Sequence, residues 1–319
     1  MITVLMATYN GSPFIIKQLD SIRNQSVSAD KVIILDDCST DDTIQIIKDY
    51  IEKYSLDSWL VSQNKTNQGH YRTFINLTKL VQEGIVFFSD QDDIWDSHKI
   101  EIMLPIFDRE NVSMVFCKSR LIDDESGNII SSPDTSDGIN TYSLEKLLQA
   151  WPSGYQTAYR AEVLGDMINR EFYKFPYFQF HDVLFGMLAC IYGDVIEIDS
   201  ILDSHRLHLN NVTLSSSSKS FHNSLGSRLD YYMKMYNRYD FVAQVACDEE
   251  NDDVERISKN YYELYTARYN FIKNWNIYSI LKLYQLRNYY NGKRAFISDI
   301  VYALRLHSVF GMIVSKFRR

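Results

Sequence analysis

Short apolar runs alternate along the first part of the chain with segments whose apolar residues recur every three or four positions. The runs predict strands over residues 2–8, 31–36, 58–62, 84–89 and 113–117. The segments between them predict helices over residues 12–25, 39–54, 70–84 and 97–110. Because strands and helices alternate and the strands are apolar throughout, the pattern predicts an α/β fold. Its mainly parallel sheet would have helices on both faces.

The pattern changes in the second half of the chain. Residues 119–142 carry turn chemistry and predict a surface hairpin or loop. A strand near 154–160, a helix over 180–192 and a short strand over 194–198 are expected next. Beyond the serine-rich residues 215–220, long tyrosine-rich helical segments follow. We therefore expect residues 1–220 to form the α/β domain and residues 221–319 a helical C-terminal region.

The composition of the 319 residues is that of a folded protein. Hydrophobic residues make up 45% and charged residues 23%, which excludes a disordered or fibrous chain. No apolar run approaches the roughly 18 residues that span a bilayer. The four cysteines form no CxxC pair, which favours a reducing compartment and argues against a structural zinc. The first residues predict a strand and not a signal peptide, so a cytoplasmic protein is expected.

The formal net charge of −8 is unevenly distributed. Residues 280–319 hold eight Lys or Arg and one acid, a net charge of +7, so residues 1–279 carry −15. The acidic part argues against nucleic-acid binding. The basic, aromatic tail has the composition of a segment that lies peripherally on an anionic membrane surface. The alternative for this tail is a helical appendage that packs on the rest of the chain or dimerises. Dimerisation would make the protein a homo-oligomer.

Polar residues follow several predicted strands where each strand ends. Asp36 and Asp37 end the second, and Asp90, Asp92 and Asp93 follow the fourth. In an open parallel sheet, ligands bind at this edge. Neighbouring carboxylates repel one another unless a cation neutralises them, and Mg²⁺ or Mn²⁺ combines carboxylates with substrate phosphates. The sequence therefore predicts a metal site for a diphosphate, with a solvated acidic turn as the alternative.

Four segments, in this order, resemble the nucleotide-sugar-binding half of the family 2 glycosyltransferases with a GT-A fold. They are VLMATYNGSPFIIKQLDSIRNQS, VIILDDCSTDDT, NQGHYRTFINL and FFSDQDDIW, within a resemblance that covers about residues 1–215. The last is typical of bacterial rhamnosyltransferase-like members of surface-polysaccharide assembly. The resemblance implies an inverting transferase that uses Mn²⁺ or Mg²⁺. Its donor would be a UDP-sugar or dTDP-sugar, and its acceptor a hydroxyl of a glycan or lipid-linked molecule.

The resemblance also implies which residues bind the nucleotide. Tyr9 would pack on the base, with Ala7 and Thr8 offering backbone or hydroxyl contacts. Asp37 would accept a hydrogen bond from the N3–H group that uracil and thymine share, and Asp90 aligns with the first acid of the DXD motif. An aromatic face and a fixed acceptor are physically suited to such a base. A strand-end aromatic and a capping acid are the structural alternatives.

The metal and the sugar would lie beside the nucleotide. Asp92 aligns with the metal-ligating acid of the motif, and His208, in the segment DSHRLHLNN, would complete the metal sphere. Arg206 of the same segment would neutralise the diphosphate. Asp93 and Trp95 would border the donor sugar or the acceptor. For His208 an ordinary hydrogen bond is the alternative.

The resemblance implies that Asp182 is the catalytic base, because the family usually has an acidic pair at this place that ends in the catalytic Asp. It would take the proton of the acceptor hydroxyl. His181 would share that role or orient the acceptor, and for Asp182 a helix N-terminal acid is the alternative. Trp151 and Tyr155 are candidate sugar-stacking faces. Gly154 would allow either close approach of a sugar or a tight turn.

Two other functions are compatible with parts of this pattern. A nucleotidyltransferase should show a Gly- and Lys/Arg-rich phosphate loop after the first strand, where this chain has TYNGSPFI. A non-catalytic sugar- or nucleotide-binding protein should have lost the metal acids or Asp182, and both are present.

Overall fold

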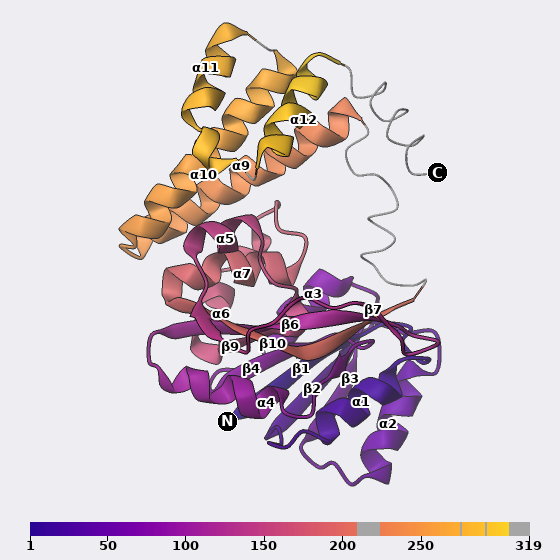
Figure 1. Cartoon of the computed structure of the whole chain (residues 1–319). Helices are drawn as coiled ribbons and strands as arrows, with labels where there is room; N and C mark the ends of the chain where they lie inside the picture. Colours follow the sequence, from indigo (N-terminus) through magenta and orange to yellow (C-terminus); the bar gives the residue numbers. More distant parts are fainter. Residues whose placement is uncertain (209–223, 275, 291, 306–319) are drawn as a thin grey trace. The chain divides into compact units, whose positions relative to one another are not determined.

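The computed structural model describes residues 1–208, 224–274, 276–290 and 292–305 (Figure 1). The chain divides into two compact units, Met1–His208 and Leu209–Arg319. The expected domain boundary near residue 220 lies outside the described residues, as do residues 306–319 of the basic tail.

The first unit is built around one mixed sheet. Its strands are β1 Ile2–Thr8, β2 Lys31–Asp36, β3 Trp59–Gln63, β4 Ile85–Ser89, β5 Ile94–Trp95, β6 Val112–Asp123, β7 Ile129–Ser131, β8 Ile139–Thr141, β9 Thr157–Arg160 and β10 Asp194–Leu207. They lie in the order β3-β2-β1-β4-β9-β6-β10-β5, with β7 beside β6 and β8 beside β10. The strands β3, β2, β1 and β4 are parallel, whereas β9 is antiparallel to both β4 and β6. The predicted α/β fold is confirmed, with more antiparallel pairing in its second half than expected.

Helices cover both faces of this sheet (Figure 1). They are α1 Ile15–Arg23, α2 Thr43–Lys53, α3 His70–Thr78, α4 Lys99–Met103, α5 Leu144–Gln149, α6 Ala161–Asn169 and α7 His181–Tyr192. On one face the core joins the sheet to α1, α2 and α4 through Val4, Met6, Leu19, Ile34, Ile47, Phe87 and Ile100. On the other face Phe88 of β4 contacts Phe74 of α3 and Phe185 of α7, with ring centroids 5.5 and 5.8 Å apart. Each such buried side chain stabilises the fold by about 1.5–3 kcal/mol.

Several elements differ in length from their predictions: β6 is longer than the strand expected over 113–117, and α3 is shorter than the helix expected over 70–84. Two further cases have a clear physical reason. The helix expected over residues 97–110 is α4 followed by a 3₁₀ helix, Leu104–Asp108, because Pro105 lacks the N–H group that would continue the α-helical pattern. The strand expected over residues 194–198 extends to Leu207. It does so because β10 pairs along β6, with register shifts between Ile198 and Asp203.

The second unit is helical. It contains α9 Leu225–Asp248, α10 Asp252–Lys273, α11 Ile277–Gln285 and α12 Lys293–Ala303. Tyr239 of α9 stacks on Tyr261 and Tyr265 of α10. Asp299 of α12 is buried and accepts a hydrogen bond from Arg268 Nε at 2.8 Å. Among the described residues, no helix is both long and apolar enough to cross a bilayer.

Candidate active site

The polar loops after β1 and β4 are joined by the side chain of Gln91. Its Nε2 donates to the carbonyl of Tyr9 at 3.0 Å, and its Oε1 accepts from the N–H of Tyr9 at 2.8 Å. Gly11 leaves room for this amide, because a Cβ atom there would lie 2.2 Å from Gln91 Oε1. The ring of Tyr9 is half-exposed at the end of β1. Gln91 was missed in the sequence, although an amide between two acids was the available signal.

The carboxylates at the end of β2 organise the neighbouring loops. Thr8 is buried and donates through Oγ1 to Asp36 at 2.9 Å, and Ala7 is buried beside it. Asp37 accepts hydrogen bonds from Asn64 Nδ2 and from two backbone N–H groups of residues 68 and 69, at 2.7–2.8 Å. A carboxylate offers about four acceptor positions, so one remains on Asp37. The contact of Asp37 with a pyrimidine stays a prediction.

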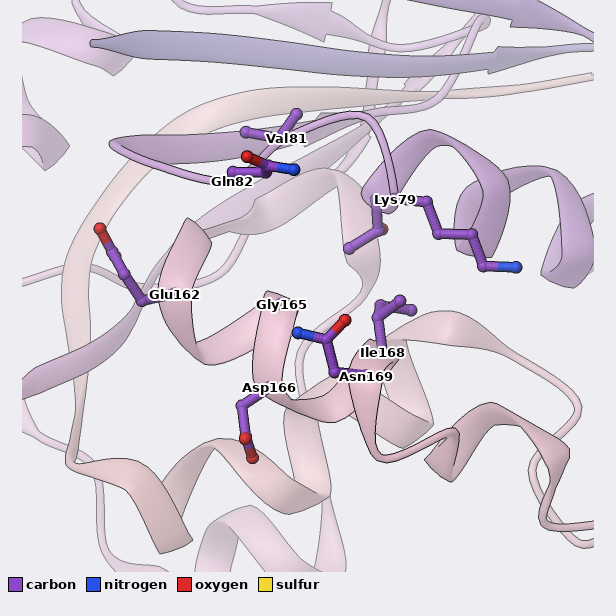
Figure 2. Close-up of a pocket in the computed structure, with 9 residues that line it drawn as sticks. Lys79, Val81, Gln82, Glu162, Gly165, Asp166, Ile168 and Asn169 are labelled. Atoms are coloured by element: carbon purple, nitrogen blue, oxygen red, sulfur yellow. The ribbon is translucent and has the colours of Figure 1, made fainter.

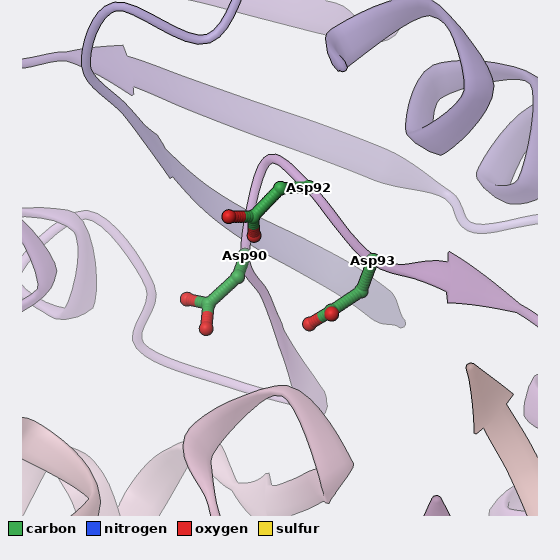
Figure 3. A group of neighbouring side chains, drawn as sticks. All are labelled: Asp90, Asp92 and Asp93. Carbon is green, nitrogen blue, oxygen red and sulfur yellow. The ribbon is translucent and has the colours of Figure 1, made fainter. Parts of the chain in front are cut away.

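Asp90, Asp92 and Asp93 lie together on the loop between β4 and β5 (Figure 3). One carboxylate oxygen from each lies within 4.8 Å of the others. A different histidine contacts each carboxylate. The pairs are Asp90 with His70 at 3.5 Å, Asp92 with His208 at 2.9 Å and Asp93 with His205 at 2.6 Å.

The innermost pair of this cluster, Asp93 and His205, binds protons tightly. Burial raises the pKa of Asp93 well above its usual range, although His205 opposes the shift. Burial lowers the pKa of His205, but the hydrogen bond and charge of Asp93 outweigh it and raise that pKa to about 9.

The cluster fits a hard divalent cation. Its ligands are oxygens from Asp90, Asp92 and Asp93, and Oδ2 of Asp93 is buried without a hydrogen-bond partner among the described residues. Asp93 thus lies within the carboxylate cluster, and its predicted contact with a sugar or the acceptor stays a prediction. His208 stacks on Phe14 at 3.9 Å, and its Nε2 is already bonded to Asp92. Ligation through that nitrogen would break this bond, so a metal-binding role for His208 stays a prediction.

Two residues expected at the donor lie inside the protein. Arg206 is 1% exposed, and its Nε donates to the carbonyl of Asp92 at 2.5 Å while its Nη2 donates to the carbonyl of Phe14 at 2.8 Å. The guanidinium therefore holds the loop that carries the acids, and its predicted contact with the diphosphate finds no support. Trp95 is also buried, against Phe87, which leaves the predicted sugar contact without support.

Asp182 lies in the first turn of α7 with the protonation behaviour of a general base. Its Oδ1 accepts from the N–H of Val183 at 2.8 Å. Burial raises the pKa of Asp182 to about 6, and the charge of Asp90 adds to this shift while His70 opposes it. Asp182 directly follows His181, whose ring centroid lies 5.1 Å from that of His70, the partner of Asp90. Its assignment as catalytic base remains a prediction.

His181, beside it, is a buried packing residue. Its ring stacks on Phe74 at 3.9 Å, and neither ring nitrogen has a hydrogen-bond partner among the described residues. Burial, reinforced by the charge of His70, lowers the pKa of His181 well below its usual range. A neutral, enclosed ring does not support the predicted contact with the acceptor. It does account for Gly154, because a Cβ atom there would lie 2.3 Å from His181 Nε2.

The candidate stacking residues have other partners. Trp151 is half-buried and packs on Gly186 of α7. A Cβ atom added to Gly186 would lie 3.0 Å from the Cβ of Trp151. Tyr155 stacks on His205 with ring centroids 5.1 Å apart and nearly parallel planes. Their roles in binding sugar stay predictions.

His70, at the start of α3, was also missed in the sequence. Burial acts to lower its pKa, but the hydrogen bond with Asp90 and the charges of Asp182 and Asp92 raise it overall. His70 thus connects the carboxylate cluster electrostatically with the candidate base. The quoted segment NQGHYRTFINL contained it, but helical periodicity gave no reason to choose it.

A surface pocket of about 480 Å³ lies elsewhere, between α6 and the segment that joins α3 to β4 (Figure 2). It is lined by residues such as Lys79, Gln82, Glu162 and Asn169 and includes none of the site residues. Because α3 starts beside the acid cluster and ends at Thr78 in this pocket, the pocket lies at the opposite edge of the sheet.

Comparison with known proteins agrees with this geometry. The family model "Glycosyl transferase family 2" matches residues 3–167. Over 153 residues the chain is 29% identical to the chondroitin synthase of Escherichia coli, covering 47% of this chain and 21% of that protein. Over 100 residues it is 41% identical to the dTDP-rhamnosyl transferase RfbG of Shigella flexneri, covering 30% of this chain and 34% of that protein. The chain therefore matches well under half the length of these two relatives.

The fold has solved counterparts. The crystal structure of S. aureus TarS 1-349 in complex with UDP superimposes with a TM-score of 0.60 at 18% identity. The superposition covers 98% of this chain and 91% of the TarS chain. At this level of identity the likeness is one of fold.

Proposed function

The chain belongs to glycosyl transferase family 2, and we propose that it moves a sugar from a UDP- or dTDP-sugar to a hydroxyl group, with inversion at the anomeric carbon. The acceptor would be a glycan or a lipid-linked molecule in the synthesis of bacterial cell-surface polysaccharide or glycoconjugate. The relatives support this class of product and donor, since one is a chondroitin synthase and the other a dTDP-rhamnosyl transferase. The TarS neighbour, which binds UDP, supports a pyrimidine diphosphate.

The observation that carries the proposal is the three-carboxylate cluster at the end of β4, joined toward Asp182 by His70, which contacts Asp90 at 3.5 Å and lies 5.1 Å from the ring of His181. Mn²⁺ or Mg²⁺ held by Asp90, Asp92 and Asp93 would supply positive charge to the leaving diphosphate. A carboxylate cluster together with a candidate base favours transfer over sugar binding alone.

Other residues of the site would bind the nucleotide base and take up the proton of the acceptor. Tyr9 offers a half-exposed ring to the base, and Gln91 fixes its backbone. The carboxylate of Asp182 accepts the proton of the acceptor hydroxyl. The oxygen of the acceptor hydroxyl forms the new bond to the anomeric carbon. At the same time the bond between the anomeric carbon and the diphosphate breaks, and its electron pair leaves with the diphosphate. Inversion follows from this single displacement.

A reducing, cytoplasmic location is part of the proposal. All four cysteines, Cys38, Cys117, Cys190 and Cys247, are free. The four side chains range from buried to exposed, and their free thiols agree with a compartment that keeps cysteines reduced.

Calorimetric titration with UDP and with dTDP, each with Mn²⁺ and with EDTA, tests the site. We expect one nucleotide to bind in the presence of Mn²⁺ and to bind much more weakly with EDTA. Asp92→Asn should remove the metal dependence, whereas Asp57→Asn, at an exposed acid between α2 and β3, should preserve it. Equal binding with Mn²⁺ and with EDTA would contradict the metal site.

A second variant separates catalysis from binding. Asp182→Asn should bind the nucleotide as well as the wild type does, yet fail to transfer sugar. Transfer at the wild-type rate would remove Asp182 from the mechanism. Loss of nucleotide binding in this variant would show that Asp182 shapes the donor site.

A further inference from the structure

The helix α11 carries apolar side chains on two different sides. Leu283 on one side is fully buried within the helical unit, and Leu286 after the helix is buried too. Four large apolar residues are exposed, Ile277 by 61%, Tyr278 by 79%, Leu281 by 55% and Tyr284 by 62%. At 3.6 residues per turn these four lie within an arc of about 120°. We call them the α11 face.

An exposed face of this kind needs a partner. A surface helix of a soluble protein normally has one apolar stripe, and the rest of its circumference is polar. The second stripe on α11 is formed by contiguous large residues, two of them tyrosines, which favour the boundary between apolar and aqueous phases. Contiguous apolar surface of this type marks a binding site.

The charges in the part of the sequence that carries the α11 face select the partner. Residues 264–319 contain ten Lys or Arg and a single acid, Asp299. Asp299 is buried and paired with Arg268, so the other charged side chains of this stretch are all positive. Lys282 and Arg287 are exposed on α11 and just after it, and Lys282 Nζ also reaches Glu263 at 2.6 Å.

We propose that the α11 face binds the surface of an anionic membrane. The apolar and tyrosine side chains would enter the boundary between headgroups and acyl chains. Lys282 and Arg287 would extend along this boundary to the lipid phosphates. A second copy of the chain fits less well, because the same face would bring like charges together. Binding of this kind does not depend on the proposed transferase activity, but it would hold the protein where lipid-linked acceptors lie.

Flotation of the full-length protein with lipid vesicles tests the proposal. The vesicles are phosphatidylcholine alone or phosphatidylcholine mixed with phosphatidylglycerol, at low and at high salt. We expect the protein to float with the anionic vesicles at low salt, and less at high salt, because salt screens the attraction. No flotation with anionic vesicles at low salt would overturn the proposal.

A matched pair of variants assigns the binding to the α11 face. Leu281→Ser removes an apolar side chain that is 55% exposed, and Leu60→Ser on β3 removes one that is 51% exposed. Leu281→Ser should weaken partitioning into anionic vesicles by about tenfold, and Leu60→Ser should leave it unchanged. Equal partitioning of the two variants would refute the assignment. A concentration-dependent dimer in sedimentation that is lost in Leu281→Ser would show that a second copy covers this face, and would also refute it.

Discussion

Replacing Gly154 by alanine tests how tightly the segment before β9 packs on the first turn of α7. The new Cβ atom would lie 2.3 Å from His181 Nε2 and 2.9 Å from its Cε1. His181 has little room to withdraw, because it is 2% exposed and stacks on Phe74 at 3.9 Å. Overpacking of this kind costs about 1–3 kcal/mol, so we expect Gly154→Ala to lower the free energy of unfolding by that amount.

The same substitution should also affect catalysis. Asp182 follows His181 directly in the chain, so a displaced ring moves the candidate base. Since small misplacements of reacting groups are costly, we expect kcat for sugar transfer to fall on the order of tenfold or more. Urea unfolding measures the loss of stability, and transfer from the donor identified by titration measures the loss of activity.

Two further variants make this reasoning refutable. Gly165→Ala, on α6, meets no atom within 4 Å and should stabilise the protein by about 0.5–1 kcal/mol. Combining Gly154→Ala with His181→Ser removes the ring, so the two changes should cost less together than the sum of their separate costs. If Gly154→Ala were as stable and active as the wild type, the close approach would be wrong. Strict additivity would show that Gly154 makes room for something other than His181.

Three other predictions follow from the site and its surroundings. Because burial raises the pKa of Asp182 to about 6, kcat/KM should fall about tenfold per pH unit below pH 6; a profile that stays flat through pH 6 would contradict its role as base. Gln91→Met removes two hydrogen bonds to the backbone of Tyr9. It should weaken nucleotide binding about tenfold in calorimetry, with little change in stability. Unchanged affinity would show that the loop at Tyr9 keeps its conformation without Gln91. Lys99 and Asp203 form a fully buried ion pair, so Lys99→Met should cost about 3–5 kcal/mol in urea unfolding. Adding Asp203→Leu should recover most of that loss, and a double variant as unstable as Lys99→Met would refute the charge argument.

The sequence determined the frame of the protein. The strands predicted over residues 2–8 and 31–36 are β1 and β2, and the strand predicted over 84–89 contains β4 Ile85–Ser89. A strand covered on both faces needs such a continuous apolar run. Since β1, β2 and β4 are parallel, their polar ends meet at one edge of the sheet. The gathering of Asp90, Asp92 and Asp93 was therefore foreseeable from sequence order.

Only the tertiary structure decided how side chains at this edge are used. Arg206 binds the carbonyl of Asp92, and Trp95 lies in the core, although their positions in the sequence motifs suggested contact with substrate. Gln91 and His70 gained importance through partners far away in the chain, Tyr9 for Gln91 and Asp90 for His70. Local periodicity reports which face of an element is apolar. It contains no information on which distant polar atom a side chain will reach.

The lengths of the helices and strands also depend partly on local sequence and partly on tertiary packing. Pro105 ends α4 through its own chemistry, a signal that the sequence contains but that the predicted helix over 97–110 did not use. The extension of β10 to Leu207 depends on β6, which supplies hydrogen bonds far beyond the apolar residues 194–198. The sequence by itself thus determined the α/β layers and the edge at which the acids gather. The packing of distant segments decided which histidine contacts each of these acids and which other acids serve the fold, because each buried polar group must find a partner in three dimensions.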